Sequence, residues 1–156
     1  MKNLVSSLSM LLLAATATVT FAADGMVGTW KLNAAKSKFT GSYVLKSQTD
    51  VREATPDGGL KVTREAQLAD GTAVKGSFTV NYDGKEYPAT GLAFDVVSVK
   101  RVDPNTVTFE VKKTGGKYHV TGQTVVSADG KTMTQTAKGT DAEGKPISST
   151  SVFDKQ

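Results

Sequence analysis

The chain has 156 residues, of which 38% are hydrophobic and 22% charged, with a formal net charge of +4 and no cysteine. The missing cysteines exclude disulfides and a lipid-modified N-terminal cysteine, and a single histidine, His119, excludes a multi-histidine metal site. Basic residues are spread along the chain without an Arg/Lys stripe or interleaved aromatic residues, so we expect no nucleic-acid partner.

Residues 1–22 have the pattern of a cleaved signal peptide. Lys2 supplies a positive start, residues 4–19 are apolar and small, and Thr20-Phe21-Ala22 places small residues at the two positions that a signal peptidase reads. The apolar run is short and is interrupted by Ser and Thr, which argues against a membrane anchor. We therefore expect a mature bacterial protein that begins at Ala23, is periplasmic or secreted, and has no stable membrane insertion.

Seven turn signals divide the remaining chain at intervals of roughly a dozen residues. They lie at 57–58, 70–71, 83–84, 103–105, 115–116, 129–130 and 141–144, and four of them are Asp-Gly pairs. Asp-Gly favours tight hairpins because Asp and Gly tolerate the positive φ angles of a type I′ turn. A long row of hairpins curls until its edges pair. We therefore predict that residues 23–156 form one all-β domain, an up-and-down antiparallel β-barrel.

Ten strands are expected, at residues 27–33, 45–54, 60–68, 72–82, 86–90, 94–102, 106–113, 117–127, 131–140 and 147–155. A turn or two of helix is expected at 34–39, which is too short to be stable alone. Alternation is clear in several strands; in 106–113, for example, Val107, Phe109 and Val111 share one face. Pro88 in the short strand 86–90 indicates an edge or a gap in the hydrogen-bond ladder, because proline has no backbone donor.

The inward faces predict different contents for the two ends of the barrel. Large residues gather at one end, and small inward residues gather at the other, namely Ala66, Gly76, Gly122, Ala137, Gly139, Ser149 and Ser151. Eight strands make a barrel that side chains just fill, and ten leave more room. The sequence therefore predicts a cavity that opens beside the connections after the first, third and fifth strands, suited to a small ligand.

Residues 26–32, Met-Val-Gly-Thr-Trp-Lys-Leu, resemble the first strand of the calycins, which include the lipocalins and the intracellular fatty-acid-binding proteins. The last strand, around Ser151-Val152-Phe153, and the count of ten strands resemble the fatty-acid-binding branch. Residues 81–88 and 127–134 are similar to exported bacterial lipocalin-like proteins. The resemblance implies an interior ligand, with Trp30 closing one end. Fatty-acid-binding proteins hold a carboxylate with Arg and Tyr on the last strand, but Ser151 and Phe153 stand at those positions here.

Two polar residues are candidates for orienting a ligand inside the barrel. By alternation Arg64 points inward, where an unpaired guanidinium is costly. It could anchor an anion or carboxylate, pair with a structural Asp or Glu, or face outward if the register differs. Gln135, with Thr124 and Ser149, could hold a polar ligand group or trapped water.

Aromatic and apolar residues supply the remaining candidates. Phe78, Phe109 and Tyr118 could be ligand walls or plain core, and Phe39 and Leu92, with Tyr43, lie on loops predicted at the open end. His119 faces outward by alternation and is expected to be a surface residue rather than a haem ligand. No nucleophile–base pair or carboxylate dyad stands out, so we expect no catalytic residue, metal or cofactor; a calycin-type isomerase or cyclase is the enzymatic alternative.

These observations favour an exported, monomeric protein that holds a hydrophobic or amphipathic molecule inside a calycin-like barrel. The alternative is a non-enzymatic envelope interaction module, with a filled barrel and a loop or edge strand that recognises a protein or envelope component. The volume of the space inside the barrel distinguishes these two hypotheses. A single cavity above about 300 Å³ favours the binding protein, whereas scattered water-sized voids favour the module.

Overall fold

The computed structural model describes residues 24–156, so the predicted signal peptide lies outside the described residues. The elements are β1 (Gly28–Leu32), the short 3₁₀ helix η1 (Ala34–Lys36), β2 (Lys38–Thr40), β3 (Leu45–Ala54), β4 (Leu60–Leu68), β5 (Ala73–Val80), β6 (Asp83–Thr90), β7 (Val96–Asp103), β8 (Thr106–Lys112), β9 (His119–Val126), β10 (Thr132–Thr140) and β11 (Pro146–Lys155). Within residues 24–156 no helix has the length and apolarity needed to cross a membrane.

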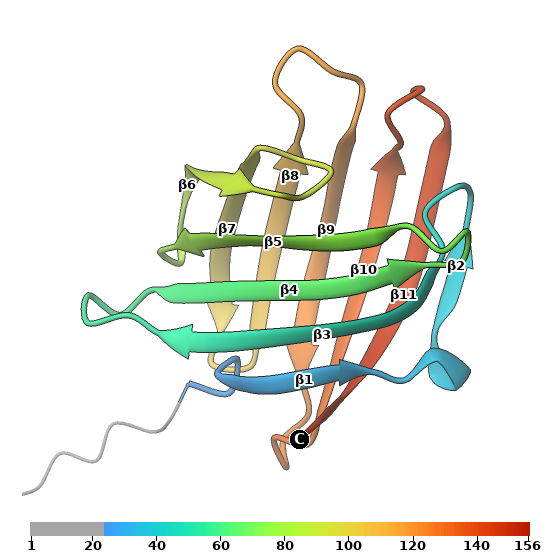
Figure 1. Cartoon of the computed structure of the whole chain (residues 1–156). Coiled ribbons are helices and arrows are strands. Elements are labelled where there is room, and N and C mark those ends of the chain that lie inside the picture. Colours follow the sequence, from blue (N-terminus) through green and yellow to red (C-terminus); the bar gives the residue numbers. More distant parts are fainter. Residues whose placement is uncertain (1–23) are drawn as a thin grey trace, which may run out of the picture.

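The strands form a closed, antiparallel, calycin-like barrel. Neighbours follow chain order from β3 to β11, β1 pairs with β3, and a further pairing of β1 with β11 closes the ring, with Trp30 opposite Lys155. β2 pairs with another part of β11, so that β1 and β2 together make one interrupted strand of the ten-strand barrel. In Figure 1 the layer of β1, β3, β4 and β5 crosses in front of the layer of β7 to β11 at a steep angle. The predicted fold class is confirmed.

The first connection differs from the sequence-based prediction. The helix expected at 34–39 is wrong beyond Lys36, because only Ala34–Lys36 is helical. The Asn33 side chain caps this turn by accepting a hydrogen bond from the Lys36 backbone N–H at 3.2 Å. Phe39, predicted on a loop, lies in β2 opposite Ser149 of β11. The pairing of β2 with β11 therefore brings Phe39 to the barrel.

The ladder is weakest between β5 and β6, next to Pro88. Only Ser77–Thr90 and Phe78–Ala89 are paired between these two strands, and the β6–β7 register shifts between Asp83 and Glu86. Because proline cannot donate a backbone hydrogen bond, this interruption agrees with the gap that Pro88 predicts. In Figure 1 β6 lies above β5 where the two layers meet.

One end of the barrel is filled by large side chains. Trp30 is fully buried, and its indole Nε1 donates a hydrogen bond to the Met26 carbonyl at 3.1 Å. The Asp24 carboxylate accepts hydrogen bonds from the Tyr82 hydroxyl and the Arg101 guanidinium, both at 2.7 Å. These contacts hold the first described residues against this closed end.

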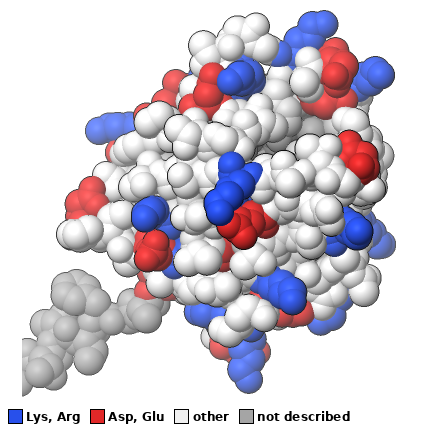
Figure 2. Space-filling view, viewed as in Figure 1, with Lys and Arg blue, Asp and Glu red and all other residues white. Residues whose placement is uncertain are grey.

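The outer surface carries charges of both signs. Figure 2 shows Lys and Arg interspersed with Asp and Glu on the visible face. His119 is exposed on β9, as alternation predicts, and its Nε2 lies 2.7 Å from the Glu110 carboxylate on β8.

Candidate functional site: the barrel cavity and its ion cluster

A continuous cavity of about 120 Å³ lies inside the barrel. Its wall is mostly aliphatic and aromatic, with side chains from both layers. The residues on which the site rests are Phe39, Tyr43, Gln48, Arg52, Arg64, Phe78, Phe94, Phe109, Tyr118, Thr124, Gln135, Ala137, Ser149 and Ser151. Exposed Lys138 and Ser148 also line it, near the end that carries Phe39. This volume is below the value of about 300 Å³ that would favour a binding protein. The space is nevertheless one cavity, not the scattered water-sized voids expected of an interaction module.

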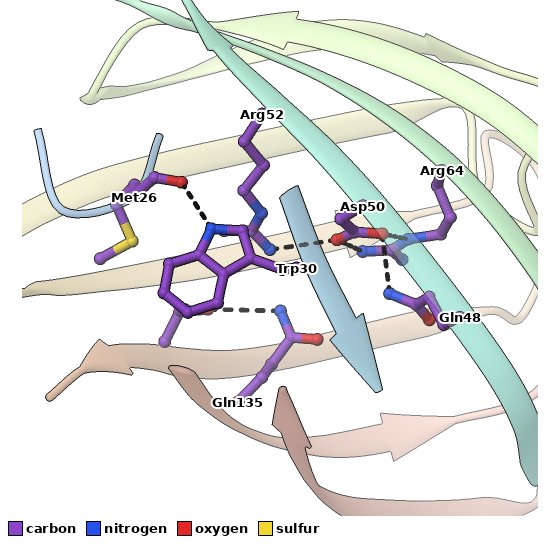
Figure 3. A network of polar contacts seen from close by, with 8 residues as sticks. Met26, Trp30, Gln48, Asp50, Arg52, Arg64 and Gln135 are labelled. Atoms are coloured by element: carbon purple, nitrogen blue, oxygen red, sulfur yellow. Dashed lines mark hydrogen bonds and ion pairs between the residues drawn. The ribbon is translucent and has the colours of Figure 1, made fainter. Parts of the chain in front are cut away.

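A cluster of four polar side chains forms part of the barrel interior; we call it the Asp50 cluster. Gln48, Asp50 and Arg52 alternate along β3 and are all buried, and Arg64 on β4 lies opposite Asp50 in the register. Arg64 binds the carboxylate with two hydrogen bonds of 2.9 Å, from Nε and Nη2. Gln48 Nε2 donates to the same carboxylate at 2.9 Å, and Arg52 Nη2 does so at 3.2 Å (Figure 3).

The charges of the Asp50 cluster stabilise one another against the cost of burial. Burial raises the pKa of Asp50, but the charge and hydrogen bonds of Arg64, followed by those of Arg52, lower it to about 2. Burial lowers the pKa of Arg64, and the bidentate contact with Asp50 outweighs this and raises it. For Arg52 burial dominates, and its pKa is lowered despite Asp50. Because a guanidinium stays protonated in proteins and the pKa of Asp50 is lowered, all three groups are charged at neutral pH, and Arg52 is the less well compensated arginine.

Arg52 also has unused hydrogen-bonding capacity. A guanidinium offers five N–H donors, and within residues 24–156 Arg52 donates one hydrogen bond, to Asp50. Its Nε is enclosed and has no partner among the described residues. Arg64, by contrast, uses two nitrogens on one carboxylate in the fork geometry typical of strong pairs.

Two tyrosine hydroxyls lie close to this cluster. Burial raises the pKa of Tyr43, and it raises that of Tyr118 to about 12, with a smaller contribution from Tyr43. Both side chains are therefore neutral donors at physiological pH. The Tyr118 ring stacks with Phe94, with ring centroids 6.4 Å apart, and Phe94 packs against Phe78 in turn.

The structure places six of the seven predicted site residues on the cavity wall. These are Arg64, Phe78, Phe109, Tyr118, Gln135 and Phe39. Arg64 faces inward, so the outward register considered above is wrong, and its acidic partner is Asp50. Gln135 Nε2 donates to the Thr124 hydroxyl at 3.3 Å.

Leu92 is the exception, and it does not line the cavity. Its Cγ lies 2.6 Å from where a Cβ on Gly76 would be, so Leu92 fills the space that this glycine leaves. Gly122 is covered similarly, because a Cβ there would meet the ring of Phe109, its partner on β8, at 2.5 Å. The expectation that these small residues leave open space is therefore wrong at both glycines. Of the small inward residues, Ala137, Ser149 and Ser151 do border the cavity.

Sequence reasoning missed Gln48, Asp50 and Arg52, although a signal for them exists. A three-residue loop at 56–58, between the hydrogen-bonded Thr55 and Gly59, pairs Arg52 with Val62 and Asp50 with Arg64, which is the observed register. If Arg64 faces inward, its cross-strand neighbour must do so too. The half-exposed Val51 hides this pattern, because hydropathy alone favours Val51 on the inner face.

The cavity wall is suited to binding a polar group within an otherwise apolar site. Guanidinium, hydroxyl and amide donors are surrounded by aromatic and aliphatic surface, as in small-molecule sites generally. In the part of the chain that the structure describes, no group of three or more His, Cys, Asp or Glu side chains could hold a metal ion.

Comparison with known proteins supports the fold through structure alone. No protein-family model and no curated protein matches the sequence. Among solved structures, EF1p2_mFAP2b bound to DFHBI aligns with a TM-score of 0.51 and 11% identity, covering 86% of this chain and 97% of that one. The wild-type fluorescent protein UnaG aligns with a TM-score of 0.50 and 14% identity, covering 83% and 96%. A mutant of UnaG gives a TM-score of 0.51 and 14% identity, covering 85% and 96%.

Proposed function

We propose that this protein binds a small hydrophobic or amphipathic molecule inside the barrel. The observation that carries the proposal is the continuous cavity, whose largely apolar wall includes a few polar donors. Burial of apolar surface would supply most of the affinity, about 25 cal/mol per Å². One of the similar structures, EF1p2_mFAP2b, is bound to DFHBI, which supports the use of such a barrel for a small molecule.

The cavity volume limits the size of the occupant. An engineered apolar cavity of about 150 Å³ binds benzene, and the cavity here has about 120 Å³. A small ring or short chain fits this space. A longer molecule would extend past Phe39 and Tyr43 or displace their side chains.

Native mass spectrometry of the protein, purified gently from the envelope fraction of its own host, tests the proposal. We expect an added mass of no more than a few hundred daltons that is lost on denaturation. Ala137→Leu, which fills the cavity, should abolish the added mass, whereas Thr136→Leu on the adjacent exposed position should retain it. A clean apo mass for the wild type would contradict the proposal and favour the interaction module.

We also propose that the protein is exported, works as a monomer and is not an enzyme. The pattern of residues 1–22 supports export. The same mass spectrum tests both export and oligomeric state, because a cleaved monomer has the mass of residues 23–156. A mass that includes residues 1–22 in the envelope fraction would contradict cleavage after Ala22.

A further inference from the structure

The cavity wall carries an excess of buried positive charge. Arg52 and Arg64 both line it, whereas among the described residues no Asp or Glu does. Asp50, which is fully buried behind them, supplies one negative charge for the two guanidinium groups. Removing a charge from water is costly unless it is paired, so the cluster has a net charge of +1 in a place where an uncompensated charge is unfavourable.

Asp50 compensates the charge of Arg64 more fully than that of Arg52. Arg64 makes the bidentate contact with Asp50, so its charge is matched at short range. Arg52 shares the same carboxylate through a single longer hydrogen bond, and its Nε has no partner among residues 24–156. Arg52 is only 7% exposed, so bulk water does not replace the missing partner.

We propose that the ligand is a small organic monoanion, such as a carboxylate, and that its charged group accepts hydrogen bonds from Arg52. Arg64 and Asp50 would act together as a neutral pair that holds Arg52 in place. This inference rests on the proposed function. It differs from the sequence-based prediction, which gave the anchor role to Arg64.

The position of Arg52 also sets the orientation of the ligand. Along β3, Arg52 lies closer than Asp50 to the turn at residues 55–59, on the side of the filled end of the barrel. An anion at Arg52 would therefore enter with its charged group first. Its apolar part would lie between Phe78, Phe109 and Tyr118.

The test uses benzoate and benzamide, which have nearly the same shape and differ in charge. We expect benzoate to bind the mature wild-type protein at least about tenfold more tightly than benzamide in calorimetric titrations, because a hydrogen bond to a charged group is stronger. Benzoate should also shift the ¹⁵N–¹H signal of Arg52 Nε, which is assigned by its loss in Arg52→Lys. Arg52→Gln should bring benzoate binding down to the benzamide level and leave benzamide binding unchanged.

Arg101→Gln is the matched control, because Arg101 is paired with Asp24 and does not line the cavity. It should leave the binding of both probes unchanged. Equal binding of the two probes with an unshifted Arg52 signal would overturn the inference and leave the proposed function standing. Loss of benzoate binding in Arg64→Gln but not in Arg52→Gln would return the anchor role to Arg64 and overturn the inference. Failure of both probes to bind would overturn the proposed function itself for ligands of this size.

Discussion

Replacing Asp50 with Asn should destabilise the protein strongly, because among residues 24–156 it is the only carboxylate in contact with Arg52 and the partly buried Arg64. Breaking a buried ion pair from one side costs about 3–5 kcal/mol. Part of this cost depends on pH. The pKa of Asp50 falls from its ordinary 3.8 to about 2 in the folded protein, which corresponds to about 2 kcal/mol of stability.

The sign of the pH effect follows from the lowered pKa. Because the folded protein holds Asp50 ionised more strongly than the unfolded chain does, the contribution is present above about pH 4 and is lost as the pH falls toward 2. The difference in unfolding free energy between wild type and Asp50→Asn should therefore shrink by about 2 kcal/mol between pH 7 and pH 2.

Urea unfolding followed by fluorescence measures this difference, because Trp30 is the only tryptophan and is fully buried. Glu65→Gln is a matched control. It also removes one negative charge, next to Arg64 on β4, but from an exposed ion pair with Lys75, and it should have little effect. An Asp50→Asn variant no less stable than Glu65→Gln, or a difference independent of pH, would refute this account of the cluster.

Three further outcomes are expected. Gly122→Ala should destabilise the barrel by about 1–3 kcal/mol in thermal unfolding, because the added Cβ would clash with the Thr136 carbonyl and the Phe109 ring. Gly25→Ala is the control, since a Cβ at that position has only ordinary contacts. Trp30→Phe should cost about 1–3 kcal/mol in urea unfolding followed by circular dichroism, because the buried Met26 carbonyl loses its donor; an unchanged midpoint would contradict this. Tyr118 should ionise near pH 12 in an ultraviolet titration, and its contribution to stability should be lost as the pH rises from 10 to 12. The pKa values of Tyr43, Tyr82 and Tyr87 are also raised, so Tyr118→Phe should reduce the amplitude near pH 12 by one tyrosine. An unchanged amplitude would disprove the assignment.

The barrel fold could be predicted from the sequence because local turn and strand signals repeat along the chain. The Asp-Gly turns and the alternating strands fix the hairpins one after another, and the bounds of β3 and β4 agree with the predicted ranges 45–54 and 60–68. The three-residue strand β2 was not predicted, since its formation depends on pairing with β11, more than a hundred residues away.

The site was predictable only in part, and the reasons are physical. Alternation determines which side chains face inward, so Arg64 and Gln135 were identified. It does not determine what fills the space around a glycine, which depends on a loop residue such as Leu92 at Gly76. Hydropathy, in turn, favours Val51 over Asp50 for the interior, because a buried carboxylate is tolerated only when cationic partners such as Arg64 on the neighbouring strand compensate it.

The pairing of β1 with β11 has a consequence for how the chain folds. Most strands pair with their neighbours in sequence, and these contacts close short loops, but the contact of Trp30 with Lys155 closes a loop of nearly the whole described chain. Loop closure costs more entropy as the loop lengthens, and long-range contacts slow folding. The β3–β4 hairpin, with Asp50 opposite Arg64, can therefore form early while its charges are still hydrated. Joining the first and last strands is expected to be the late, rate-limiting step, and it is the step that removes those charges from water.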